Sequence, residues 1–139
     1  MNGPVNVPEG IGAAHVLLVE DNEANRDMLS RRLTRKGFRV SFATDGPGAV
    51  TATQTLRPDI VLMDVDLPGC SGLDATESIR TRADLQAIPV IALTAHALSG
   101  DRERALAAGC NEYETKPINF PRLLDKMAAL LNARAGVSR

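Results

Sequence analysis

Short runs of apolar residues alternate along the chain with longer stretches in which apolar residues recur every three or four positions. Four of the short runs are unbroken or nearly so, which is typical of strands covered on both faces of a sheet. With a weaker fifth run, the predicted strands are Val16–Val19, Phe38–Ala43, Ile60–Met63, Val90–Leu93 and Glu112–Glu114. The segments between them are long enough to be helices.

These longer stretches have the spacing of amphipathic helices. The clearest is the last, with one apolar stripe made of Phe120, Leu123, Leu124, Met127, Leu130 and Leu131. The earlier ones are marked by Met28, Leu29 and Leu33, by Ala49, Val50, Thr53 and Leu56, by Leu73, Thr76 and Ile79, and by the segment from Ser99 to Ala108. Gly37 and Gly109 follow two of them, at the place of a helix C-terminal glycine. Five strand–helix alternations predict an α/β domain with a parallel sheet and right-handed crossovers.

Composition narrows the class of protein. The 139 residues, 44% of them hydrophobic, suit one globular domain. We assign residues 15–132 to it, between a flexible leader at 1–14 and a tail at 133–139. With 16 basic and 17 acidic side chains and 3% aromatics, the chain does not have the composition of a nucleic-acid binder. It shows no signal-peptide pattern, no bilayer-length apolar run and only 2 cysteines, so a cytoplasmic protein is expected.

Polar residues of particular types follow the predicted strands, at the edge of the sheet where α/β domains place their functional groups. They are Glu20 and Asp21 after the first strand, Asp64 and Asp66 after the third, Thr94 and His96 after the fourth, and Lys116 with Pro117 after the fifth. If the first and third strands are neighbours, their carboxylates converge, and such crowding favours protonation or a bound cation. Oxygen ligands without His or Cys suit a hard cation, so we expect Mg²⁺ there.

The same residues form a set suited to phosphoryl transfer. A carboxylate such as Asp64 can accept a phosphoryl group as an aspartyl phosphate. A metal on Asp21, the ammonium of Lys116 and the hydroxyl of Thr94 would together neutralise the transferring group. Each residue alone is weak evidence, since Glu20 and Asp21 would equally suit a helix cap, Thr is common in strands, and lysines are common on surfaces. The prediction rests on their joint placement, each at the end of its own strand.

In these motifs the chain resembles the receiver domain of two-component response regulators, the CheY-like family. The matching segments are VLLVEDN, IVLMDVDLPGCSGLDAT, VIALTAHA and GCNEYETKPI, and the resemblance covers about residues 15–132. It implies a flavodoxin-like (βα)5 three-layer sandwich with a parallel five-stranded sheet of order 2-1-3-4-5. The LPGCSGLDAT and KPI segments are similar to those of single-domain receivers and of hybrid-kinase receivers, and the choice between these two stays open.

The resemblance implies a role for each matching residue. Asp64 is the expected phosphoacceptor, and Lys116 and Thr94 are expected to contact the phosphoryl group. The expected Mg²⁺ ligands are Asp21, Asp64, the backbone carbonyl of Asp66 and, through water, Glu20. Thr94 and Tyr113 form the expected switch, in which Tyr113 turns inward when Thr94 moves. The Lys116–Pro117 peptide bond is expected to be cis.

The resemblance also implies partners. A histidine kinase or histidine phosphotransfer protein would donate the phosphoryl group, and the domain would catalyse its own phosphorylation and dephosphorylation without being a conventional enzyme. A downstream protein would contact the face formed by the fourth helix, fifth strand and fifth helix, with no nucleic acid and no membrane involved. The chain would then either switch protein–protein interactions or relay the phosphoryl group.

Two residues are individual to this sequence. Asp66 and His96 lie two residues beyond Asp64 and Thr94, at positions that flank the path of hydrolytic water in the family. Our hypothesis is that they tune the lifetime of the phosphorylated form; the alternative is that both are solvated loop residues. Cys110 is expected to be a small packed hydrophobe, and Cys70 is left without a role.

Two other functions stay open from the residues alone. The string Asp64-Val65-Asp66 resembles the nucleophile motif of haloacid-dehalogenase-like phosphohydrolases, whose second Asp is a general acid. That motif belongs on a first strand, and the chain is short for such an enzyme. The other alternative is an interaction module that works without phosphorylation.

Overall fold

The computed structural model describes residues 13–95 and 100–137 as one α/β unit. In chain order the elements are β1 (His15–Val19), α1 (Glu23–Arg35), β2 (Arg39–Ala43), α2 (Gly46–Leu56), β3 (Ile60–Asp64), α3 (Gly72–Arg80), a single 3-10 turn (Ala83–Leu85), β4 (Val90–Thr94), α4 (Asp101–Ala107), β5 (Glu112–Thr115) and α5 (Phe120–Val137). The predicted alternation of strand and helix is confirmed.

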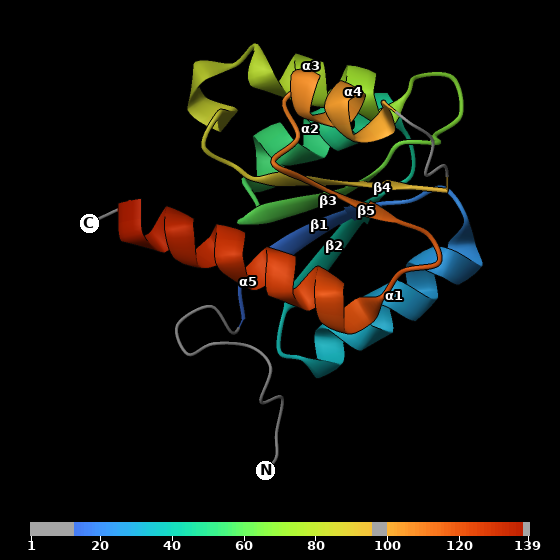
Figure 1. Cartoon of the computed structure of the whole chain (residues 1–139), viewed down its shortest axis with the longest axis vertical. Coiled ribbons are helices and arrows are strands. Elements are labelled where there is room, and N and C mark those ends of the chain that lie inside the picture. The colour runs from blue at the N-terminus through green and yellow to red at the C-terminus, as the bar shows by residue number, and fades with distance from the viewer. Residues whose placement is uncertain (1–12, 96–99, 138–139) are drawn as a thin grey trace.

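The five strands form one parallel sheet of order β2-β1-β3-β4-β5. Helices α1 and α5 cover one face of the sheet, and α2, α3 and α4 cover the other (Figure 1). The expected flavodoxin-like three-layer sandwich is confirmed. In this order the chain leaves β1 toward β2 on one side and β3 lies on the other, so the carboxyl ends of β1 and β3 flank the switch point of the sheet.

The core has two layers, one on each face of the sheet. Side chains that alternate along β1 divide between them: Leu17 packs in the same cluster as Ile79 of α3, and Leu18 in the same cluster as Leu123 of α5. All four side chains are fully buried. Burying a side chain of this size contributes about 1.5–3 kcal/mol. The central strands are therefore held from both faces, and their carboxyl ends form a fixed platform for the site.

The second strand departs from the prediction that it is covered on both faces. β2 is one of the two edge strands of the sheet, and Arg39 and Phe42 are exposed, Phe42 by 57%. The guanidinium of Arg26 lies 4.8 Å from the centroid of the Phe42 ring and covers part of it. The strand also begins one residue later than predicted, because the N–H of Phe38 bonds to the carbonyl of Leu33 in the turn that ends α1.

The last helix continues further than the sequence pattern indicates. Residues 133–137 belong to the predicted tail, but in the structure they extend α5 to Val137. Ala133 and Arg134 are good helix formers, and the Arg134 guanidinium donates to the backbone carbonyl of Asp59 at 2.9 Å. This contact ties the end of the helix to the turn before β3. In α1 the apolar stripe is narrower than predicted, since Met28 is 54% exposed.

Candidate functional site

Asp64 is the last residue of β3 and is 1% exposed. One carboxylate oxygen, Oδ1, accepts the backbone N–H of Asp66 at 2.9 Å. The other, Oδ2, lies 3.2 Å from the Nζ of Lys116. The side chain is therefore held from two directions, with each oxygen bound to a different donor.

Lys116 follows β5 and reaches back over the end of the sheet. Its backbone N–H donates to the carbonyl of Thr94 at 2.7 Å, and its Nζ lies 3.0 Å from Oε1 of Glu20. Burial alone would lower the pKa of Lys116, but the hydrogen bond to Glu20 and the charge of Asp64 raise it above its ordinary value. The ammonium is thus kept charged beside the carboxylates. The Lys116–Pro117 peptide bond is cis, as expected.

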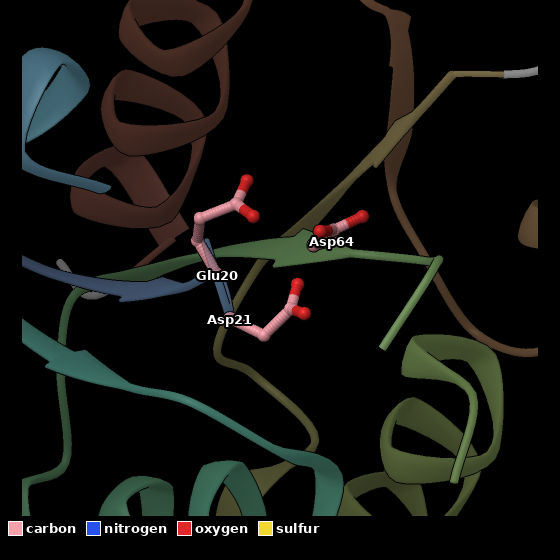
Figure 2. Close-up of side chains that lie close together, drawn as sticks. All are labelled: Glu20, Asp21 and Asp64. Atoms are coloured by element: carbon pink, nitrogen blue, oxygen red, sulfur yellow. The ribbon is translucent and has the colours of Figure 1, made fainter. Parts of the chain in front are cut away.

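Glu20, Asp21 and Asp64 form an acidic cluster at the adjacent ends of β1 and β3, as Figure 2 shows. Each offers a carboxylate oxygen, and these oxygens lie within 4.8 Å of one another. Burial raises the pKa of Glu20, and the charge of Asp64 raises it further. The hydrogen bond from Asn22 and the ammonium of Lys116 lower it, but the net shift is upward. The cluster brings three carboxyl groups together beside the ammonium of Lys116, and this set of oxygen ligands suits a hard divalent cation.

The alternative role of Glu20 and Asp21 as helix caps is wrong. Asn22 is the N-cap of α1, and its side-chain oxygen accepts the N–H of Asn25 at 2.9 Å. Glu20 instead accepts the N–H of Asn22 through Oε2 at 3.1 Å while Oε1 faces Lys116. Both oxygens of Glu20 are thus engaged within the protein, whereas the side chain of Asp21 is exposed at the rim of the cluster.

Thr94 and Tyr113 share a pocket beside the acidic cluster. Thr94 ends β4 and is 2% exposed, and it follows Leu93, the register partner of Asp64. Tyr113 lies on β5, half-buried against the core layer beneath α2, α3 and α4. The pocket has a volume of about 410 Å³ and is lined by Val65, Asp66, Ser71, Leu73, Thr94, Asp101, Arg104, Ala105 and Tyr113. The two residues predicted to form a switch therefore border one space.

The remaining candidate residues lie in different surroundings. The carboxylate of Asp66 is exposed, and its Oδ2 accepts the N–H of Ala95 at 3.2 Å. His96 lies outside the described residues. Cys110 is buried, and burial raises the pKa of its thiol, which agrees with a packed small hydrophobe. Cys70 is half-buried, and its Sγ contacts the carbonyl of Ser71 at 3.6 Å.

Two features near the site were missed from the sequence. The first is Gly72, which begins α3 directly against the backbone of Asp64.

The second is a set of contacts between β5 and α5. The buried carboxylate of Glu114 on β5 bonds to the guanidinium of Arg122 at 2.6 Å. Lys126, one helical turn beyond, donates to the carbonyl of Tyr113 at 2.6 Å. The sequence contained an indication of these ion pairs. Arg122 and Lys126 are four residues apart and so lie on one face of α5, and glutamates alternate along β5 at 112 and 114.

Comparisons with known proteins agree with this geometry. The family model for the response regulator receiver domain matches residues 16–128. The polar-differentiation response regulator DivK of Brucella anthropi is 38% identical over 116 residues, which are 84% of this chain and 94% of that protein. Among residues 13–95 and 100–137, no helix has the length and apolar character needed to cross a membrane.

Two solved structures show the same architecture. The receiver domain of a sensor histidine kinase from Pseudomonas aeruginosa, solved with a magnesium ion coordinated in its active-site cleft, has a TM-score of 0.80 and 39% identity, covering 86% of this chain and 98% of that one. The chemotaxis response regulator CheY4 of Vibrio cholerae has a TM-score of 0.76 and 29% identity, covering 85% and 98%.

Proposed function

Because the chain belongs to the response regulator receiver domain family of two-component signalling, we propose that it is phosphorylated on Asp64 by a histidine kinase or histidine phosphotransfer protein. The observation that carries this proposal is the environment of Asp64, a buried strand-end carboxylate with its two oxygens on separate donors, Asp66 N–H and the Lys116 ammonium. The family is one of signalling proteins rather than conventional enzymes.

The chain's own groups supply positioning and charge for the transfer. An oxygen of Asp64 forms the new bond to phosphorus as the bond from phosphorus to the donor's imidazole nitrogen breaks, and the imidazole leaves with that electron pair and takes up a proton. The hydrogen bond from Asp66 fixes the direction of the Asp64 carboxylate. Lys116 and the hydroxyl of Thr94 then face the oxygens of the arriving phosphoryl group. In this sense the domain catalyses its own phosphorylation.

The acidic cluster fits Mg²⁺. Three carboxylate oxygens within 4.8 Å, with no His or Cys among them, are a hard-cation donor set. Asp21, Asp64 and the backbone carbonyl of Asp66 would hold the ion directly, and Glu20 would act through water, as the family resemblance implies. Mg²⁺ bound there supplies positive charge to the carboxylates and to the phosphoryl oxygens.

The donor protein docks, in this proposal, on the groove between α1 and the segment after β5. The groove has a volume of about 520 Å³ and opens beside the site, since Glu20 and Lys116 line it together with Met28, Arg32, Pro117 and Ile118. A phosphohistidine must come within bonding distance of Asp64, and this groove adjoins the lysine that contacts Asp64. The exposed Met28 offers apolar surface, and the exposed Arg32 offers a cation, to the donor protein.

Phosphorylation is read out, in this proposal, through Thr94 and Tyr113. Movement of the Thr94 hydroxyl toward the phosphoryl group frees space in the shared pocket, into which Tyr113 turns. Tyr113 lies on β5 between α4 and α5, so its position changes the face presented to a downstream partner. A phosphohydrolase of the haloacid-dehalogenase type is not supported, since the family match is to receivers and the strands β1 and β2 precede β3.

Intact-mass spectrometry after incubation with acetyl phosphate tests the proposal. We expect one phosphoryl adduct that requires Mg²⁺, is absent when a chelator removes the metal, and is released by hydroxylamine as an acyl phosphate is. A folded protein that gives no adduct with acetyl phosphate or with a phosphorylated histidine phosphotransfer domain would contradict the proposal. It would favour an interaction module that works without phosphorylation.

The lifetime of the phosphorylated form is expected to depend on Asp66 and His96, which follow the phosphoacceptor and Thr94 by two residues. Asp66 lines the pocket next to Thr94, where an attacking water would be oriented. We expect Asp66→Asn and His96→Ala each to change the dephosphorylation rate by about three- to tenfold. The rate is measured as decay of the adduct after the donor is removed, and rates equal to that of the wild-type chain would mean that both are ordinary solvated loop residues.

A further inference from the structure

Asp66 contacts the site with both its backbone and its side chain. Its N–H donates to Oδ1 of Asp64 at 2.9 Å, and its carboxylate Oδ2 accepts the N–H of Ala95 at 3.2 Å. The first bond stays within the turn after β3, and the second crosses to the residue after β4. The Asp66 carboxylate thus bridges the two segments that flank the phosphoacceptor.

The N–H of Ala95 is well placed to donate a hydrogen bond to an anion. Ala95 follows Thr94, and the backbone of β4 runs beside Asp64 in the register Asp64 with Leu93. Backbone N–H groups at such strand ends are good donors to the oxygens of a bound anion, and these charge-assisted bonds are stronger than neutral ones. In this structure the oxygen on that donor belongs to the carboxylate of Asp66.

We infer that the Asp66 carboxylate competes with the phosphoryl group for the Ala95 N–H and so holds the site in its unphosphorylated form. This inference rests on the proposed function, because the competitor is a phosphoryl oxygen on Asp64. The carboxylate opposes phosphorylation in two ways: it occupies a donor that the phosphoryl group would use, and it adds a negative charge near the acidic cluster. Asp66 is a positioning residue here, acting through Ala95.

The pocket beside Thr94 offers a place for the displaced carboxylate. Asp66 already lines this pocket together with Arg104, whose guanidinium is ion-paired with Asp101 one helical turn before it on α4. When a phosphoryl oxygen takes the Ala95 N–H, the Asp66 side chain swings into the pocket toward that guanidinium. Release of the bridge and movement of Thr94 therefore take place at the edge of the same pocket, which couples phosphoryl binding to Ala95, the residue after β4.

Binding of fluoroberyllate, a phosphoryl mimic, in the presence of Mg²⁺ measures this competition without a chemical step. We expect Asp66→Ala to bind the mimic about fivefold more tightly than the wild-type chain, since both the competing acceptor and the charge are gone. Asp66→Asn is expected to lie between the two, because it loses the charge but keeps an oxygen for the Ala95 N–H. Both variants keep the backbone N–H and carbonyl of Asp66. Asp74→Asn, which removes an exposed charge on α3, is the matched control.

The amide resonance of Ala95 is the second readout. In the metal-free protein we expect Asp66→Ala to shift this resonance upfield and to speed its exchange with solvent, whereas Asp74→Asn leaves it in place. Equal affinity in all variants, or an unchanged Ala95 resonance, would overturn the inference. If the wild-type chain itself binds no fluoroberyllate while folded, the proposed phosphorylation fails instead, so the two failures are distinguishable.

Discussion

Asp64→Asn is expected to eliminate the phosphoryl adduct while leaving the protein folded. The asparagine side chain has the same shape, and its oxygen still accepts the N–H of Asp66. It lacks the carboxylate oxygen that attacks phosphorus, so intact-mass spectrometry should show no mass increase with any donor. No other result depends so completely on one functional group.

The stability of this variant separates a chemical loss from a structural one. The charge of Asp64 contributes to the raised pKa of Glu20, so the two carboxylates repel each other in the metal-free protein. Removing one of them should leave the melting temperature unchanged or higher when Mg²⁺ is absent. The wild-type chain should gain stability as Mg²⁺ is added, and the variant should gain less, since it has lost one ligand.

Asp125→Asn is the control for Asp64→Asn, because it removes an exposed acid in the second turn of α5. It should behave as the wild-type chain does in both measurements. An adduct on the Asp64→Asn chain, mapped by peptide mass to another residue, would move the phosphoacceptor away from β3.

The residues of the site were predictable because each follows a strong local pattern. Asp64 comes directly after an unbroken apolar run, and Glu20 and Asp21 come after another, so the ends of two buried strands carry the acids. Their convergence depends on β1 and β3 being neighbours, which periodicity alone does not establish. The strand order came from the family resemblance, and the observed order β2-β1-β3-β4-β5, with Val16 in register with Ile60, confirms it.

What the sequence did not reveal depends on contacts between distant segments. Phe42 reads as a strand residue of the core, yet its exposure follows from the place of β2 at the edge of the sheet. Residues 133–139 are predicted to be a flexible tail, yet α5 runs to Val137, and the Asp59 carbonyl gives Arg134 a partner 75 residues away. Asn22 and its acidic neighbours are all good caps, and only the geometry of the turn decides among them. In each of these three cases the local propensity of the residues fits both the predicted and the observed structure, so it could not predict which one forms.

Gly72 is the strongest case of such a hidden constraint, and replacing it tests the packing behind the site. A Cβ at this position would lie 2.1 Å from the backbone oxygen of Asp64 and 2.9 Å from its carbonyl carbon. The close approach is built by the loop itself: the N–H of Gly72 donates to the carbonyl of Val65 at 3.0 Å, and Ser71 caps the helix through the N–H of Leu73. The first residue of α3 thus packs directly against the backbone at the end of β3.

We expect Gly72→Ala to destabilise the fold by about 3 kcal/mol, because a clash with backbone can be relieved only by moving α3 or the end of β3. For a domain of this size the melting temperature should fall by roughly 10 °C. The same movement displaces Asp64 from Lys116, so adduct formation should also drop at temperatures where the variant is folded. Thermal unfolding by circular dichroism and the acetyl phosphate assay measure the two effects.

Gly37→Ala separates this steric effect from the ordinary cost of losing a glycine. Gly37 has φ +101°, and a Cβ there would meet only the backbone N of Ala13, at 3.9 Å. Its replacement costs about 1 kcal/mol through the left-handed backbone alone, far from the site, and should leave adduct formation unchanged. If Gly72→Ala is no more destabilising than Gly37→Ala and forms the adduct normally, then the close approach of α3 to Asp64 does not constrain the site. If the two differ as expected, the position of the phosphoacceptor is set by a residue that has no side chain.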